Sequence, residues 1–312
     1  MKKVLTLLLA TLLLLTAAAG CAPSPGEASP GGASPGGTSP ETASPETASP
    51  EGNNQESAFD STSVIGLFTR EEGSGTRGAF EELTGVGEDM SPEAAVKSET
   101  NEILTSVEEN LYGISYVSLG SLTEGVKAVS VDGVAPSTAT IKDGTFKIQR
   151  PFIVCVNAEK AENELVKDFI SFMLSAEGQE VSASKWIKAV EDAPAYTASG
   201  LSGSLTIGGS TSVDPCMVEM VKVYNTFNPD VNIEITGGGS GTGISEATGG
   251  ILDIGMSSRD LTADELASLT ATTIAQDGVA VIVNKENPIT NLTMAQVKSI
   301  FTGEVTAWNE IG

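Results

Sequence analysis

Histidine is absent from the 312-residue sequence, and only three cysteines are present. Without an imidazole the chain cannot form a Ser-His-Asp triad, a Cys-His pair or an imidazole-ligated zinc site, and three thiols cannot supply a four-thiolate one. The sequence also lacks the GxxxxGK[ST] pattern, whose lysine contacts nucleotide phosphates. Most common hydrolytic machinery is therefore excluded, no metal site or cofactor is expected, and nucleotide binding loses support.

Aromatic residues make up only 5% of the chain, whereas glycine occurs 34 times, which predicts many tight turns. The formal net charge is −24. A chain this acidic is not expected to bind nucleic acid, which requires a basic surface. We interpret the acidity as a well-solvated surface.

The N-terminus combines a positive start with a short apolar run. Two lysines precede apolar residues 4–19, and small residues lead to Cys21. This pattern is typical of an export signal, which we place at 1–20. Small residues directly before a cysteine resemble the lipobox of bacterial lipoproteins, although Ala18 stands where leucine is most common. We expect acylation of Cys21 and a lipid anchor on the outer face of the cytoplasmic membrane. An ordinary secretory signal with an incidental cysteine is the alternative.

Residues 22–58 contain no large apolar side chain, and Ser-Pro recurs in them at five-residue intervals. Such a composition cannot bury enough surface to fold, so a disordered Ser/Pro/Gly-rich tether is predicted over 21–58. Composition does not separate a tether from a glycosylated stalk or a spacer that crosses a cell wall. No later segment is long and apolar enough to span a bilayer.

From about residue 62, β-branched runs alternate with helical patterns, which predicts an α/β fold with parallel sheets covered on both faces. Strands are expected at 63–69, 112–119, 126–133, 147–157, 204–209, 231–236 and 278–284. Helices are expected at about 162–174, 215–227, 262–269 and 293–301. The helix at 215–227 has one apolar stripe, formed by Met217, Met220, Val221, Tyr224 and Phe227.

The two cysteines of this α/β region, Cys155 and Cys216, both lie in apolar contexts. We therefore expect two buried thiols. An exported chain could instead pair them.

Three segments share one design, in which a strand is followed by Gly, Ser and Thr and then by a helix start. They are "TREEGSGTRGAF" (69–80), "GGSTSVDPCM" (208–217) and "GGGSGTGI" (237–244). Glycine lets the backbone approach a ligand closely, and the free amides and dipole of a helix start favour an anion. The hydroxyl groups add further donors that can also accept.

Each segment alone is more often a plain turn with an N-cap than a binding loop. Arg70 alone would most simply form a surface ion pair with Glu71 or Glu72. Three such segments in one chain, the first carrying Arg70 and Arg77, favour a site for a small oxyanion, because arginine matches phosphate geometry in a bidentate way.

At these segments the chain resembles the phosphate-binding protein of the bacterial high-affinity phosphate ABC transporter. The resemblance also includes "DIGMSSRDL" (253–261), "IAQDGVAVIVNKENPI" (274–289), "VKSIFTGEVTAWNEIG" (297–312) and "FMLSAEGQEV" (172–181), and it extends over most of 63–312. It implies a two-lobed, periplasmic-binding-protein-like (Venus flytrap) α/β fold that holds inorganic phosphate in the cleft.

The resemblance also implies a set of phosphate ligands. Ser212 and Val213 would offer a hydroxyl and an amide, and Ser240 would do the same from the third segment. Arg70 would be the charged fork, with the shell completed by Ser74, Gly75 and Thr76. Adjacent candidates are Thr211 and Arg77.

One position departs from the family pattern. Members of the family carry an aspartate near the end of the "DIGMSSRDL" segment, where it accepts the proton of hydrogen phosphate, but here Ser258 stands at that place. Ser258 is either a neutral donor and acceptor for the anion or a turn residue. Without the carboxylate, rejection of sulfate is in doubt. Asp277 is a candidate for the missing acceptor.

The order of the segments indicates a circular permutation. In the family the "GSTSV" segment comes first, whereas here it follows the "REEGSGTR" segment, and 191–204 joins the two halves. Permutation is tolerated where the original ends lie close together. We expect one lobe at about 60–145 plus 280–312 and the other at about 146–279. The alternative is a pair of half-domains that cannot close on one ligand.

The functional hypothesis is a lipid-anchored solute receptor on the extracellular or periplasmic side. It would deliver phosphate to the membrane permease and ATPase subunits of an ABC transporter. A binder or sensor of another tetrahedral oxyanion, such as sulfate or molybdate, is the alternative, and a regulatory or adhesive surface protein is a further one. An enzyme such as a phosphatase is not expected, because neither a nucleophile–base pair nor a two-metal carboxylate cluster is evident.

Overall fold

The computed structural model describes residues 59–311, so the predicted signal, Cys21 and most of the tether lie outside the described residues. In the described part, the helices are α1 (Gly75–Thr84), α2 (Thr100–Glu108), α3 (Thr138–Lys142), α4 (Glu164–Met173), α5 (Ala176–Lys185), α6 (Asp214–Phe227), α7 (Ser240–Thr248), α8 (Ala263–Leu266) and α9 (Met294–Phe301). None of these helices is long and apolar enough to cross a membrane.

A ten-stranded sheet has the order β2-β1-β3-β11-β6-β10-β8-β9, and β4 and β7 also pair with β11. Its strands are β1 (Gly66–Arg70), β2 (Ala95–Lys97), β3 (Gly113–Ser118), β4 (Val126–Ala128), β6 (Gln149–Asn157), β7 (Ile187–Lys188), β8 (Gly203–Gly209), β9 (Val231–Thr236), β10 (Ile254–Ser257) and β11 (Leu269–Asn284). A separate parallel pair joins β5 (Ser130–Val131) to β12 (Asn291–Leu292).

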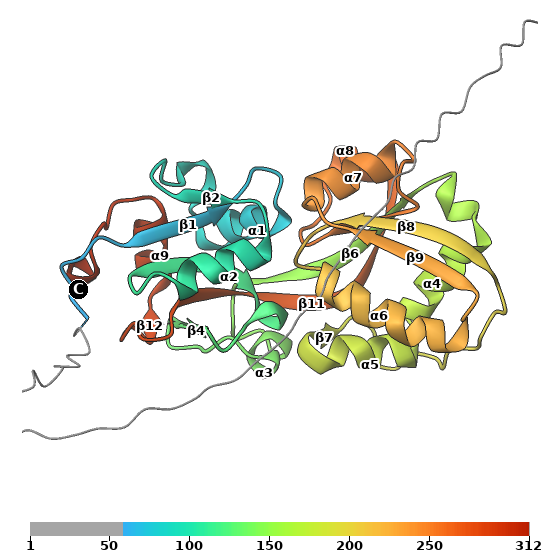
Figure 1. The fold of residues 1–312 in the computed structure, drawn as a ribbon, viewed down its shortest axis with the longest axis horizontal. Helices are drawn as coiled ribbons and strands as arrows, with labels where there is room; N and C mark the ends of the chain where they lie inside the picture. The colour runs from blue at the N-terminus through green and yellow to red at the C-terminus, as the bar shows by residue number, and fades with distance from the viewer. Residues whose placement is uncertain (1–58, 312) are drawn as a thin grey trace, which may run out of the picture. The chain divides into compact units, whose positions relative to one another are not determined.

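The prediction of an α/β fold is confirmed, but the prediction of purely parallel sheets is wrong. The pairs β1–β2, β1–β3, β8–β9 and β8–β10 are parallel, whereas β11 is antiparallel to β3, β4, β6 and β7. The reason is the path of the chain. β6 leaves one half of the fold and β11 returns to it, so the two strands must run in opposite directions (Figure 1).

Two hydrophobic cores lie on either side of this crossing, which gives the two lobes visible in Figure 1. The core of the first lobe includes Phe80, Tyr116, Ile148 and Val279, and Phe301 packs into it from α9. The core of the second lobe includes Phe152, Leu205, Met217, Tyr224 and Ala275. Along the chain, the change from one core to the other therefore falls between Ile148 and Phe152 and again between Ala275 and Val279.

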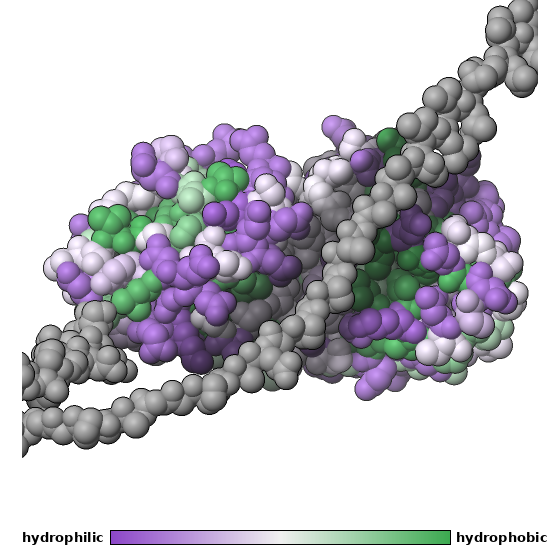
Figure 2. All heavy atoms as spheres, in the orientation of Figure 1, coloured by the Kyte–Doolittle hydropathy of each residue, from purple (hydrophilic) through white to green (hydrophobic). Residues whose placement is uncertain are grey.

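The surface of both lobes is mainly hydrophilic on the face shown in Figure 2, with smaller hydrophobic areas between. This agrees with the acidic composition, because charged side chains stay in water unless they are paired. The apolar stripe of α6 is turned inward as predicted: Met217, Met220 and Tyr224 are fully buried. Cys155 and Cys216 are both free and buried, as expected, and burial raises the pKa of each thiol to about 12.

Two predicted elements differ in extent. The helix expected at 262–269 is only α8, Ala263–Leu266, and β11 begins directly after it at Leu269 instead of at 278. The run at 126–133 is divided into β4 and β5. It ends in a turn where Asp132 has φ 52° and Gly133 has φ 79°. The first half of β11, "LTATTIAQ", contains β-branched residues that favour a strand, but the length of the strand is defined by its pairing with β6.

The beginning and the end of the described chain lie side by side in the first lobe. The amide of Ile65 donates to the carbonyl of Thr306 at 2.8 Å, and the amide of Asn309 donates to the carbonyl of Ser61 at 2.7 Å. When the two ends of a chain lie close together, they can be joined and the chain can be cut in another loop without loss of its core.

Two carboxylates help to fix the connecting segment 191–204 to the second lobe, and Glu177 accepts from the amide of Tyr196 at 2.7 Å. Asp168 of α4 accepts the hydroxyl protons of Tyr196 at 2.7 Å, Tyr224 at 2.6 Å and Ser199 at 2.9 Å on a single oxygen, Oδ2. The Tyr196 ring also packs edge-on against Phe172. The segment is therefore part of the lobe's structure although it has no regular secondary structure before β8 begins at Gly203.

Replacing Asp168 with alanine should lower the free energy of unfolding by about 2–4 kcal/mol, because three hydroxyl groups lose a charged acceptor and two of them belong to packed aromatic side chains. Urea unfolding measures this change. Asp192→Ala, in an exposed part of the same segment, is the matched control and should change stability by less than about 0.5 kcal/mol. Equal effects of the two variants would contradict the role given to Asp168.

Candidate anion-binding site

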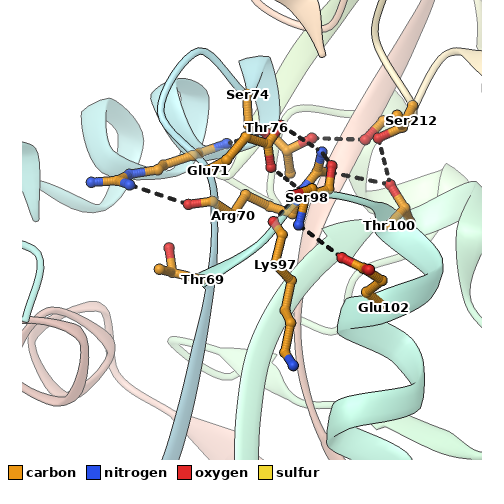
Figure 3. A network of polar contacts seen from close by, with 12 residues as sticks. Thr69, Arg70, Glu71, Ser74, Thr76, Lys97, Ser98, Thr100, Glu102 and Ser212 are labelled. Carbon is orange, nitrogen blue, oxygen red and sulfur yellow. Dashed lines mark hydrogen bonds and ion pairs between the residues drawn. The ribbon is translucent and has the colours of Figure 1, made fainter. Parts of the chain in front are cut away.

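Three helix starts meet between the lobes. α1 follows β1 in the first lobe, whereas α6 follows β8 and α7 follows β9 in the second. The hydroxyl groups of Thr76 and Ser212 are 2.7 Å apart (Figure 3). The amide of Gly241 donates to the carbonyl of Gly73 at 2.9 Å. The segments that the sequence singled out are therefore brought together, two from one lobe and one from the other.

At the start of α1, the backbone of the first lobe comes very close to side chains of the second lobe. A Cβ atom at Gly75 would lie 2.2 Å from the Ser240 hydroxyl and 2.8 Å from that of Ser258, distances that an alanine cannot adopt. Ser74 caps the helix by accepting from the amide of Arg77 at 3.4 Å. Since a helix leaves its first-turn amides without an intrahelical acceptor, glycine at this position lets those amides face the opposite lobe at short range.

The second lobe contributes a cluster of buried serines. The Ser258 amide donates to the Ser240 hydroxyl at 3.0 Å, and the Ser210 hydroxyl donates to the Ser258 hydroxyl at 2.9 Å. Ser258 follows β10 and is fully buried beside the start of α7. The Val213 amide, by contrast, donates to the Ser210 carbonyl at 3.1 Å within its own loop. Hydroxyl groups that can donate or accept therefore line this side.

Arg70 is buried, with 2% of its surface exposed, and it forms the ion pair with Glu71 that a plain structural role would give it. Its Nε and Nη2 donate to the two Glu71 oxygens at 2.9 Å. Nη1 donates to the Thr100 hydroxyl at 3.3 Å, and that hydroxyl is 3.1 Å from the hydroxyl of Thr211. The guanidinium is thus buried while its partner Glu71 is partly exposed, and through Thr100 the guanidinium is linked to the opposite lobe.

Thr100 and Ser210 were not singled out from the sequence. Thr100 begins α2, a fourth helix start at the site, and the amide of Ser98 just before it is held by the Glu102 carboxylate at 2.9 Å. No capping-box spacing marks this helix start, because its N-cap is Glu99 and makes no side-chain capping hydrogen bond. A cavity of about 290 Å³ opens beside it, lined by Thr100, Thr211 and Asp214 among others.

Arg77 lies close to the site but is turned along its own helix. Its Nε donates to Glu81 at 2.6 Å and its Nη1 donates to the Arg70 carbonyl at 3.1 Å. The structure therefore gives Arg77 a role in holding the end of β1 against α1.

Asp277 lies in the middle of β11, where the lobes join, and is fully buried. The Ser118 hydroxyl donates to its Oδ1 at 2.9 Å, and Arg150 Nε and Nη2 donate to its Oδ2 at 3.1 Å. Burial raises the pKa of Asp277 to about 6, although Arg150 and Ser118 act in the opposite direction. The partner Arg150 was missed in the sequence, because nothing in "KIQRPF" distinguishes a buried arginine from an exposed one.

The model of the PBP superfamily domain matches residues 53–177 and 194–312, and the chain belongs to this superfamily. Among its relatives is the phosphate-binding protein PstS 2 of Streptococcus pneumoniae, 40% identical over 270 residues, which are 83% of this chain and 92% of that protein. PstS 2 of Streptococcus agalactiae is 42% identical over the same share of both chains. The crystal structure of a phosphate-binding protein of a phosphate ABC transporter from S. pneumoniae matches with a TM-score of 0.65 and covers 80% of this chain and 100% of its own.

Other phosphate-binding proteins match over a shorter stretch. PstS of Bacillus subtilis is 35% identical over 116 residues, 36% of this chain and 38% of that protein. PstS of Pseudomonas aeruginosa is 34% identical over 150 residues, 42% and 46% of the two chains.

The stability contributed by Asp277 should depend on pH. Its folded pKa of about 6 lies above the ordinary value of 3.8. Protonation therefore favours the folded state: the contribution is fully present below about pH 3.8 and is lost as pH rises through about 6. Between pH 4 and 7 the wild-type chain should lose up to about 3 kcal/mol relative to Asp277→Asn, in which this titration is absent. Urea unfolding of both chains across this range measures the difference, and parallel pH curves would contradict the raised pKa.

Proposed function

We propose that this chain is an extracytoplasmic solute-binding protein, not an enzyme, that captures inorganic phosphate between its lobes and delivers it to the permease and ATPase subunits of an ABC importer. The observation that carries the proposal is the meeting of hydroxyl-bearing helix starts from both lobes, within 2.7 Å of each other at Thr76 and Ser212. The names of relatives with 40% identity over most of the chain support phosphate as the solute.

The proposed shell suits a tetrahedral oxyanion. Helix starts offer amides and a favourable dipole, and hydroxyl groups offer donors that can turn to accept. In this proposal the ligands are those that the family resemblance implies: Arg70, Ser74, Gly75, Thr76, Ser212, Val213, Ser240 and Ser258. Ser258 takes the place of a carboxylate as a neutral acceptor for the proton of hydrogen phosphate. Asp277 is the less favoured acceptor, because both of its oxygens are already engaged.

The lobes would open and close about the crossing strands. The two hydrophobic cores meet along the chain near 148–152 and 275–279, so we propose these short stretches as the hinge. The lobes expected at about 60–145 plus 280–312 and about 146–279 are shifted by a few residues in this proposal, because Ile148 and Val279 pack in the core of the first lobe. A register shift between Thr273 and Ala275 interrupts the β6–β11 ladder close to this place. An interrupted ladder bends more readily than a regular one.

The circular permutation remains part of the proposal. A match over 83% of this chain and 92% of S. pneumoniae PstS 2 is expected if those streptococcal proteins share its order of segments. Matches limited to 36–42% of the chain are expected if the B. subtilis and P. aeruginosa proteins have the other order. The adjacent ends of the described chain and the well-anchored segment 191–204 also support it.

Anchoring by acyl chains on Cys21, with 21–58 as a tether, completes the proposal. It rests on the sequence of the N-terminus alone. A lipid anchor would keep the receptor near its permease on the outer face of the membrane.

Calorimetric titration of the purified chain with phosphate tests the proposed function. We expect one site with micromolar or tighter affinity, about −8 kcal/mol or more favourable, and phosphate binding that survives an excess of sulfate. Tighter binding of sulfate or molybdate would favour the alternative oxyanion, and absence of anion binding would contradict the proposal.

The group that rejects sulfate can be identified in the same assay. Ser258→Ala should weaken phosphate binding about tenfold and allow sulfate to compete, because the acceptor for the phosphate proton is lost. Asp277→Asn should leave the sulfate competition as it is in the wild type. Unchanged competition in Ser258→Ala would refute the assignment of Ser258, and sulfate competition that appears in Asp277→Asn would instead make Asp277 the discriminating group.

Closure can be blocked at one glycine. Gly75→Ala should lower phosphate affinity more than tenfold, because the new methyl group would collide with Ser240 and Ser258 when the lobes meet. It should leave the melting temperature of the ligand-free chain within a few degrees, since alanine is a good helix former. Gly78→Ala in the same helix is the control, because its Cβ would lie 3.7 Å from Arg259. Equal affinity of the two variants would argue against closure at Gly75.

A further inference from the structure

A buried arginine at the crossing of the lobes has one end without a partner. Arg150 is the second residue of β6, and the exposed fractions of the Arg150 and Asp277 side chains are 1% and 0%. The edge of the guanidinium formed by Nε and Nη2 faces Asp277, at 3.1 Å from Oδ2. Nη1 lies on the other side and is buried, with no hydrogen-bond partner among residues 59–311.

Arg150 is within electrostatic reach of Arg70, which belongs to the proposed anion site. Burial lowers the pKa of its guanidinium, Asp277 opposes this effect, and the positive charge of Arg70 lowers the pKa further, as expected of two neighbouring cations. Tyr116 is also within its electrostatic reach, and the Tyr116 hydroxyl is 2.7 Å from that of Thr69 at the end of β1. On the opposite side, the Asp277 charge raises the pKa of the Cys216 thiol in the first turn of α6, in addition to the larger effect of burial.

A purely structural ion pair does not account for this arrangement. Structural pairs persist in a protein interior when the remaining donors are also satisfied. Here both Asp277 oxygens are engaged by Ser118 and by the Nε and Nη2 of Arg150, and Nη1 donates to neither of them. Two guanidinium groups within electrostatic reach of each other, one with bare donors, are both stabilised by an anion that comes to lie near them.

We propose that Arg150 is a second guanidinium that acts on the bound anion, with Nη1 as the donor, and that Asp277 and Ser118 are positioning residues that hold it. The proposal rests on the proposed function, because it requires an anion between the lobes. It assigns Asp277 a place behind the arginine instead of a direct contact with the ligand. It also adds a positive charge to a site in which Arg70 is already paired with Glu71.

The test removes the pair as a unit. Arg150→Met combined with Asp277→Asn leaves no unpaired charge in the interior, and replacing a buried pair by uncharged side chains is often neutral for stability. We expect the double variant to unfold at about the same urea concentration as the wild type but to bind phosphate at least about tenfold more weakly in calorimetric titrations at pH 7.5. The control is Lys160→Met combined with Asp253→Asn, which removes an ion pair of 2.7 Å in the second lobe and should leave the affinity within twofold.

A folded double variant that binds phosphate as tightly as the wild type would overturn the role proposed for Arg150, but it would leave the proposed function intact. If the double variant does not fold, Arg150→Lys gives the answer. Its ammonium group can still pair with Asp277 but cannot present Nη1, so a roughly tenfold loss of affinity is expected, and an unchanged affinity would overturn the proposal. A wild-type chain that binds no phosphate would instead overturn the proposed function, and with it the premise of this inference.

Discussion

The antiparallel pairing of β6 with β11 is the contact on which the rest of the structure depends. Residues 269–278 of β11 pair with 149–157 of β6, and the remainder of β11 pairs with β3 in the first lobe. One strand therefore belongs to both lobes. Because backbone hydrogen bonds hold this strand in both lobes, the crossing connects the two cores directly, and the proposed opening and closing would take place about it.

A strongly acidic chain is compatible with the proposed anion site. Net charge describes the surface, whereas the groups that face the site are helix starts, hydroxyl groups and buried guanidinium groups, each with its own local partner. Arg70 is balanced by Glu71 and Arg150 by Asp277, so the positive charges can stay in the interior without a ligand. The binding energy is then expected from oriented donors at short range, since a charge-assisted hydrogen bond contributes about 1.5–3 kcal/mol.

Much of this arrangement could be predicted from the sequence. Local signals sufficed for α6, where Asp214-Pro215 and one apolar stripe define the helix, and for the three Gly/Ser/Thr segments, which share a strand-to-helix pattern. The prediction of two lobes needed the family resemblance, because no local pattern says which strands cross. The length of β11, the helix start at Thr100 and the partner of Asp277 could not be predicted. Each of them is defined by pairing across more than a hundred residues of sequence, and propensity does not register such contacts.

In the proposed function, helix starts from both lobes act on one anion. A crystal structure of the chain grown with phosphate tests this most directly. We expect a single phosphate within hydrogen-bond distance of α1 at Ser74–Thr76 and of the starts of α6 and α7 at Ser212 and Ser240. A phosphate held by one lobe alone, or bound away from these three helix starts, would contradict it.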